Sequence, residues 1–249
     1  MSPNLSKIAA VILSAGKGTR LNCTDKPKVM LEIGGRPIVA YIVETLQKIG
    51  FNKEQICLVV GFKKEIIEDY FGGSVSYGLQ EQQLGTAHAA YVGIKSLPNE
   101  IEQVIVLGGD DGAFYKPETI LNLITAHLTD KATISFLTAT VANPGSFGRV
   151  VRENDGIKII EKEYLTAEQQ NIKEVNTGTY VVDRHWFEKE FPSFPKMQKL
   201  GEFGMNPSIT IAESQGKKVQ AIKLSDNNEW HGINTVTELE LADQLKRTI

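Results

Sequence analysis

A glycine-rich loop near the start of the chain carries the residues best suited to bind phosphate. It reads Leu13-Ser14-Ala15-Gly16-Lys17-Gly18-Thr19-Arg20, and Lys26-Pro27-Lys28 follows. Small residues let backbone N–H groups approach phosphate oxygens, while Arg20 and Lys28 can neutralise a triphosphate. A Walker P-loop and a dinucleotide fingerprint do not fit, because the first needs Gly-Lys-Ser/Thr and the second a third glycine where Leu21 stands. A tight strand-to-helix turn with solvated cations is the alternative.

A pair of aspartates is the second chemical feature. Asp110 follows the apolar run Val106-Leu107, just beyond an expected buried strand, where a hard cation bound to phosphate would take an oxygen ligand. Asp111 is the competing candidate, because aspartates at strand ends often only cap turns. His88 lies at an expected helix start between alanines, so a packed or capping role is expected and no catalytic one.

Alternating strands and helices are expected to position these residues. The continuous apolar run 8–13 predicts a buried strand, and helical spacing predicts a helix over 37–49 with Gly50 as its stop signal. The same reasoning predicts strands at 55–60, 75–77 and 104–107 and helices at 63–71 and 86–97. This order implies an α/β fold with a mostly parallel sheet, helices on both faces, and ligands beyond the carboxyl ends of the strands.

The second half of the chain is less regular. Strands are predicted at 133–140, 148–152, 175–182 and 219–222, and helices at 117–128 and 237–245. This mixture predicts a small antiparallel patch over a substrate pocket. No linker, charge block or repeat divides the chain, so one domain is expected over 1–249.

Composition limits the classes of partner. The 249 residues have a net charge of -3 and 41% hydrophobic content, without the basic stripe that nucleic acid binding requires. No stretch approaches the roughly 20 consecutive apolar residues of a membrane span, so a cytoplasmic location away from membranes is expected. Cys23 lies in a polar context and Cys57 in an apolar run, which argues against a disulfide framework and a zinc site.

The order of these motifs resembles a known family. Residues 13–20 with Pro27-Lys28-Val29 resemble the signature of the sugar-phosphate nucleotidyltransferases, closest to the uridyltransferase domain of bacterial N-acetylglucosamine-1-phosphate uridyltransferases. The likeness runs from about Ile8 to about Leu245. It implies a Rossmann-like, GT-A-like fold, UTP and a sugar phosphate as substrates, and Mg²⁺ as cofactor. The hexapeptide repeats of the acetyltransferase domain in the bifunctional enzymes do not appear, so no such domain is expected and the oligomeric state stays open.

The resemblance also implies roles for individual residues. Residues 80–89 resemble the segment that holds the uracil base, although alone they would be a polar loop with Thr86 as a helix cap. Arg20, Lys28 and Asp110 are the implied catalytic group. The implied nucleotide-binding residues are Leu13, Ala15, Gly16, Gly18, Thr19, Gln80, Gln83, Gly85 and Thr86.

The remaining implied roles concern metal and sugar. The resemblance favours Asp110 as metal ligand and adds Asn234 from Gly232-Ile233-Asn234, where Asn234 or Thr235 would otherwise be a helix cap. Gly148, Glu161 and Asn176 are the implied sugar-binding residues, with a solvated surface acid as the alternative for Glu161.

Three departures from the family pattern fall on the sugar side. Gly108 stands where the family has a tyrosine, residues 201–206 replace an aromatic-rich segment, and Asp111-Gly112 replaces Pro-Leu. Fewer rings should enlarge or reshape the pocket, which leaves the acceptor open, with N-acetylglucosamine 1-phosphate as a candidate. A cytidylyl- or guanylyltransferase of the same fold and a non-catalytic nucleotide or sugar sensor are the alternatives; intact Arg20 and Lys28 argue against a glycosyltransferase.

Overall fold

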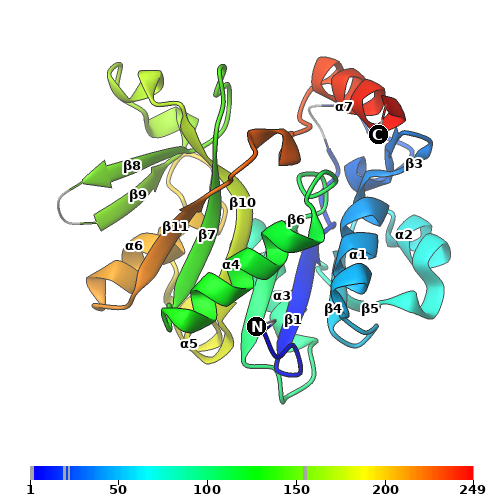
Figure 1. Ribbon diagram of the computed structural model, residues 1–249, viewed down its shortest axis with the longest axis horizontal. Coiled ribbons are helices and arrows are strands. Elements are labelled where there is room, and N and C mark those ends of the chain that lie inside the picture. The colour runs from blue at the N-terminus through cyan, green and yellow to red at the C-terminus, as the bar shows by residue number, and fades with distance from the viewer. Residues whose placement is uncertain (1–2, 19–20, 22, 154–155, 249) are drawn as a thin grey trace.

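A central sheet organises the protein. The computed structural model describes residues 3–18, 21, 23–153 and 156–248 (Figure 1). These residues form a nine-stranded sheet in the order β11-β7-β10-β6-β1-β4-β5, with β8 paired to β10 and β9 to β8. The strands are β1 (Ile8–Leu13), β4 (Ile56–Val60), β5 (Ser76–Leu79), β6 (Gln103–Gly108), β7 (Ile134–Thr140), β8 (Arg149–Glu153), β9 (Gly156–Ile160), β10 (Glu174–Asp183) and β11 (Val219–Lys223).

Strand direction divides the sheet into two parts. The four strands β6, β1, β4 and β5 are mutually parallel, and β11 is parallel to β7. Strand β10 runs antiparallel to both β6 and β7, and it also pairs with the β8–β9 hairpin. The expected mostly parallel sheet and the small antiparallel patch are therefore both present.

Helices cover both faces of the sheet (Figure 1). The helices are α1 (Ile38–Ile49), α2 (Lys64–Phe71), α3 (Thr86–Lys95), α4 (Pro117–Thr129), α5 (Arg184–Glu190), α6 (Asn206–Ser214) and α7 (Val236–Thr248). Alternate residues of β1 enter different cores, because successive strand side chains point to opposite faces. Ala10 and Ile12 pack in the core that includes α1 and α4, whereas Ala9 and Val11 pack in the core that includes α3, α5 and α6.

The approach of α3 to the sheet depends on one glycine. A Cβ atom added at Gly93 would lie 2.4 Å from Cγ1 of Val11 and 2.7 Å from Cγ2 of Val59. Any larger residue would push the helix outward, at a typical overpacking cost of about 1–3 kcal/mol. The C-terminal half of α3 is thus closely packed against β1 and β4.

The C-terminal helix packs beside the first third of the chain. Strands β2 (Glu32–Ile33) and β3 (Arg36–Pro37) form a small hairpin, and α7 lies against it (Figure 1). Ile33, Ile38, Ile233 and Ala242 share one buried cluster there. The backbone N–H of Gly34 donates to Oδ1 of Asp243 at 2.8 Å. This contact fastens α7 to the turn between β2 and β3.

Most predicted elements are confirmed with ends shifted by a few residues. The β2–β3 hairpin, β9, α5 and α6 were not predicted, because each is short or has a sparse apolar pattern. Within the described residues, no helix has the length and apolar content needed to cross a membrane.

Candidate active site

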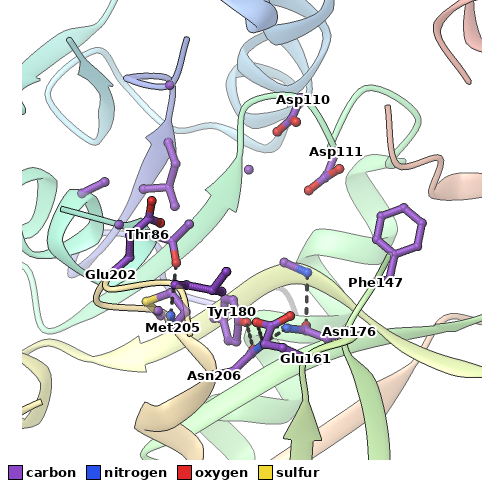
Figure 2. Close-up of a pocket in the computed structure, with 18 of the residues that line it drawn as sticks. Thr86, Asp110, Asp111, Phe147, Glu161, Asn176, Tyr180, Glu202, Met205 and Asn206 are labelled. Atoms are coloured by element: carbon purple, nitrogen blue, oxygen red, sulfur yellow. Dashed lines mark hydrogen bonds between the residues drawn. The ribbon is translucent and has the colours of Figure 1, made fainter. Parts of the chain in front are cut away.

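A cavity of about 530 Å³ lies beyond the carboxyl ends of β1 and β6, where open α/β sheets bind their ligands. Figure 2 shows Asp110 and Asp111 on one side of it and a cluster of Glu161, Asn176 and Asn206 on another. The cavity is lined by these expected site residues: Leu13, Ala15, Gly16, Gln80, Gln83, Gly85, Thr86, Asp110, Glu161, Asn176 and Asn234.

Lys28 joins the two residues expected to hold a metal. Its ammonium forms an ion pair with Oδ2 of Asp110 and donates to Oδ1 of Asn234 at 3.1 Å. Lys28 begins a 3₁₀ turn, Asp110 follows β6, and Asn234 precedes α7. Three residues chosen separately from the sequence therefore meet at one point.

The cap of α7 leaves the Asn234 side chain available. Oγ1 of Thr235 accepts from the backbone N–H of Glu238 at 3.3 Å. The Glu238 carboxylate in turn accepts from the backbone N–H of Asn234 at 2.7 Å and that of Thr235 at 2.8 Å. This reciprocal pattern is a capping box, so Thr235 caps the helix while the Asn234 amide faces Lys28.

The oxygens around Lys28 suit a hard divalent cation. The Asp110 carboxylate and the Asn234 amide oxygen already converge on a positive charge, the Lys28 ammonium. Among the described residues there is no group of three or more His, Cys, Asp or Glu side chains able to hold a metal. A cation here would take few protein ligands and would need phosphate and water oxygens, which is how Mg²⁺ is commonly held.

The glycine loop leaves space for a ligand at Gly16. A Cβ atom added there would have no atom within 4 Å, although the residue lines the cavity. Gly18 has a φ of +72°, and a Cβ atom added to it would lie 2.6 Å from Cβ of Lys28. Gly18 thus lets the loop pack against Lys28, and it is not among the lining residues. Thr19 and Arg20 lie outside the described residues.

Two glutamines fix the expected base-binding segment. Gln80 is buried, and its amide donates to the Gly85 carbonyl at 3.2 Å and contacts Nδ1 of His88 at 3.0 Å. The Gln83 amide donates to the Ala15 carbonyl at 2.7 Å, which ties this segment to the glycine loop. Burial lowers the pKa of His88, in keeping with a packed, neutral imidazole.

Thr86 does not cap helix α3. Gly85, with a φ of +111°, is the residue before the helix, and the Thr86 hydroxyl accepts from the backbone N–H of Met205 at 3.1 Å. The backbone N–H of Ala87 donates to the Phe203 carbonyl at 2.8 Å. The start of α3 therefore uses the 203–205 segment as its partner, and the interpretation of Thr86 as a simple cap is wrong.

A polar network forms the expected sugar end of the cavity. The Asn206 amide donates to Oε1 of Glu161 at 2.6 Å, and its oxygen accepts from Asn176 at 2.8 Å and from the Tyr180 hydroxyl at 2.7 Å. Burial raises the pKa of the Glu161 carboxyl above its ordinary value. Glu161 is thus a partly buried member of a hydrogen-bonded network, and the surface-acid interpretation is wrong. Asn206 and Tyr180 were not predicted as site residues.

Gly148 lies next to residues that line the cavity but does not line it itself. A Cβ atom added to it would lie 2.9 Å from Cγ2 of Ile159 and 3.4 Å from Oε2 of Glu161. Its carbonyl accepts from the backbone N–H of Asn176 at 3.1 Å. The glycine therefore permits the close approach that places Glu161 and Asn176.

Two of the departures from the family pattern are glycines beside residues that line the cavity. A Cβ atom added at Gly108 would lie 2.8 Å from Oδ2 of Asp111, so a larger residue at 108 would compete with that carboxylate for space. A Cβ atom at Gly204 would lie 2.6 Å from Cε of Met197. Asp111 and Met197 both line the cavity and fill part of the room that the two glycines leave. Asp111 is therefore part of the cavity wall.

Comparison with known proteins identifies the family of this chain. The nucleotidyl transferase family pattern matches residues 9–240. The bifunctional protein GlmU of Streptococcus agalactiae is 35% identical over 240 residues, which cover 96% of this chain and 51% of that protein. The chain belongs to the nucleotidyl transferase family. It spans about half the length of the curated relatives it matches.

Solved structures of nucleotidyltransferases share the fold. A putative glucose-1-phosphate thymidylyltransferase from Bacillus anthracis, in complex with a sucrose, has a TM-score of 0.79 at 22% identity and covers 97% of this chain and 96% of its own. A UDP-glucose pyrophosphorylase complexed with UDP-glucose has a TM-score of 0.79 at 19% identity and covers 97% and 98%. These two likenesses, both below 25% identity, show the fold.

Proposed function

We propose that the protein transfers a uridylyl group from UTP to a sugar 1-phosphate, with Mg²⁺ as cofactor, and releases pyrophosphate. The convergence of Lys28, Asp110 and Asn234 carries this proposal. Asp110 and Asn234 line the same cavity as Gly16 of the glycine loop and Glu161 of the polar network, and the Lys28 ammonium contacts both of them. N-acetylglucosamine 1-phosphate is the first acceptor to test, since the sequence motifs resemble the uridyltransferase domain of N-acetylglucosamine-1-phosphate uridyltransferases and a GlmU relative covers 96% of this chain.

The protein's own residues are assigned to three tasks. Backbone groups around Gly16 approach the triphosphate, and the Lys28 ammonium neutralises its charge. The side-chain oxygens of Gln80 and Gln83 and the second amide hydrogen of Gln83 offer the acceptor and donor groups that a base edge requires, since their other amide hydrogens bond within the protein. Glu161 and the asparagines beside it accept hydrogen bonds from sugar hydroxyls.

The chemical step needs no nucleophilic side chain. A phosphate oxygen of the acceptor attacks the α-phosphorus of UTP and forms a new P–O bond, while the bond to the bridging oxygen of pyrophosphate breaks in line. Asp110 and Asn234 would hold Mg²⁺, which supplies charge neutralisation at the phosphates. The contribution of the protein is to orient the two substrates and to exclude misaligned ones.

Pyrophosphate release from UTP across a panel of sugar 1-phosphates tests the proposal. Turnover with one acceptor, lost in Asp110→Ala, is the expected result. CTP and GTP serve as competing nucleotides in the same assay, and equal turnover with either would contradict the assignment of UTP. UTP binding without turnover of any acceptor would contradict the catalytic proposal and favour a nucleotide sensor.

A further inference from the structure

A buried arginine with carbonyl partners stands beside the acceptor end of the cavity. Arg149 is 4% exposed, and Nη1 donates to the carbonyls of Pro144, at 3.3 Å, and of Phe147, while Nη2 donates to that of Gly145 at 3.2 Å. Among the described residues, no carboxylate pairs with it and its Nε has no partner. A buried charge held only by neutral groups is costly, so a simple stabilising role is a poor account of it.

The guanidinium lies inside a tight turn and defines its shape. The backbone N–H of Phe147 donates to the Pro144 carbonyl at 3.0 Å, and Gly145 has a φ of +47°, which favours glycine. The backbone of Arg149 is paired with β9 and β10, so the group that gathers these carbonyls is itself fixed to the sheet. The position of Phe147 at the end of the turn follows from that anchor.

Phe147 in turn contacts the segment that leads to Asn234. Its ring lies edge-on to Trp230, with centroids 4.7 Å apart, and a Cβ atom added at Gly232 would lie only 2.2 Å from Cζ of that ring. Trp230 is held from the other side, because its Nε1 donates to the Thr177 carbonyl at 3.1 Å. Phe147 and Trp230 both line the cavity.

These contacts connect Arg149, through Phe147, to the segment that carries Asn234, the proposed metal ligand. We propose that Arg149 is a positioning residue: its guanidinium sets the 144–147 turn so that Phe147 fixes Trp230 and Gly232, and thereby aligns the acceptor with Asn234. This inference rests on the proposed function for its kinetic consequence. Arg149 reaches the three carbonyls through two nitrogens of a rigid planar fork, and the single ammonium nitrogen of lysine cannot reproduce that spacing.

Arg149→Lys is the informative substitution, with Arg152→Lys as its matched control. Arg152 lies on the same strand but is exposed, and its Nη2 pairs with Oε1 of Glu174 at 2.7 Å. Arg149→Lys should raise the KM of the acceptor about tenfold with the KM of UTP within about twofold, since misplacement of one substrate affects that substrate most. Arg152→Lys should leave both constants unchanged.

Trp230 offers a measurement that does not depend on turnover. The chain has two tryptophans, so Trp230 is the single emitter in a Trp186→Phe background. Arg149→Lys should shift its emission to longer wavelength and increase its quenching by iodide, because Phe147 no longer covers it. Gly232→Ala, which displaces the same ring from the other side, should reproduce both the emission shift and the change in acceptor KM.

A double-mutant cycle tests whether Arg149 acts through Phe147. Arg149→Lys should add little to the acceptor KM once Phe147→Leu is present, because residues that act in series are not additive. Full additivity, unshifted Trp230 emission, or an acceptor KM equal to that of the Arg152→Lys control would each overturn the proposal. If the wild type turns over no acceptor, the proposed function fails, and the Trp230 emission alone decides the role of Arg149.

Discussion

Nζ of Lys28 lies 3.1 Å from Oδ1 of Asn234, although 206 residues separate them in the sequence. The same ammonium pairs with Asp110, whose side chain is 22% exposed against 13% for that of Lys28. One lysine therefore holds the two oxygens that are proposed to bind Mg²⁺. In the absence of substrate phosphates, lysine and metal compete for the same ligands.

Lys28→Met should tighten Mn²⁺ binding to the nucleotide-free protein, because it removes that competitor. The same change should lower turnover by about a hundredfold or more, since a cation at the phosphates is lost. Electron paramagnetic resonance titration with Mn²⁺ measures the first effect. Lys26→Met is the control, because Lys26 pairs only loosely with Glu32, at 3.9 Å. Unchanged or weaker Mn²⁺ binding in Lys28→Met would rule out the competition.

Asparagine substitutions separate the roles of the neighbouring aspartates. Asp110→Asn keeps the shape of the side chain but removes its charge, and kcat should fall by about a hundredfold to a thousandfold. Asp111→Asn should act mainly on the acceptor KM, because Asp111 lines the cavity beside Gly108. Steady-state pyrophosphate release measures both. A larger loss of kcat in Asp111→Asn would transfer the metal-binding assignment to that residue.

Gly16→Ala should impair the site without destabilising the fold. Its added Cβ would meet no atom of the protein within 4 Å, so the unfolding free energy should change by less than about 0.5 kcal/mol. UTP affinity should fall about tenfold, because the methyl group enters the space proposed for the triphosphate. Gly73→Ala, also without a neighbour within 4 Å, is the control far from the cavity. Calorimetric titration with UTP is the measurement, and equal affinities would place the nucleotide elsewhere.

Glu161→Gln should change how stability depends on pH. Burial raises the folded-state pKa of Glu161 above its ordinary value of 4.5; the hydrogen bond from Asn206 opposes this rise, and the nearby charge of Glu163 adds a smaller raising effect. The folded protein then binds more protons than the unfolded chain between the two pKa values, so this carboxyl makes stability decrease as pH rises through that window. Glu161→Gln should therefore raise the melting temperature at neutral pH, with the difference shrinking below pH 4.5. A lower melting temperature of the variant at neutral pH would contradict the assignment.

Buried strands were the most predictable parts of the fold. The apolar run 8–13 coincides with β1 because that strand is covered by helices on both faces, which leaves a continuous sequence signal. Helix α5 escaped prediction because its seven residues, Arg184–Glu190, are too few to show a helical period. The helix packs through aromatic contacts such as that of Phe187 with Phe194, and no local sequence pattern predicts these contacts.

The candidate site was predictable where its residues belong to one segment. The glycine loop and the 80–86 segment could be identified from their own order, and most of their residues line the cavity. Asn206 could not, because its partners Glu161, Asn176 and Tyr180 come from other parts of the chain. An asparagine before a proline is typical of a helix start, and Asn206 is indeed the first residue of α6. Its local pattern therefore indicates a helix start and gives no sign of a site residue.

The meeting of Lys28 with the residue before α7 has a consequence for synthesis. At about 5–20 residues per second, a ribosome needs about 10–40 s to travel the 206 residues from Lys28 to Asn234. During that interval the glycine loop and its lysine exist without the oxygen that completes the cluster. A nascent chain therefore contains Lys28 well before its contact with Asn234 can form, and translation that stops short of Asn234 yields a product in which that contact never forms.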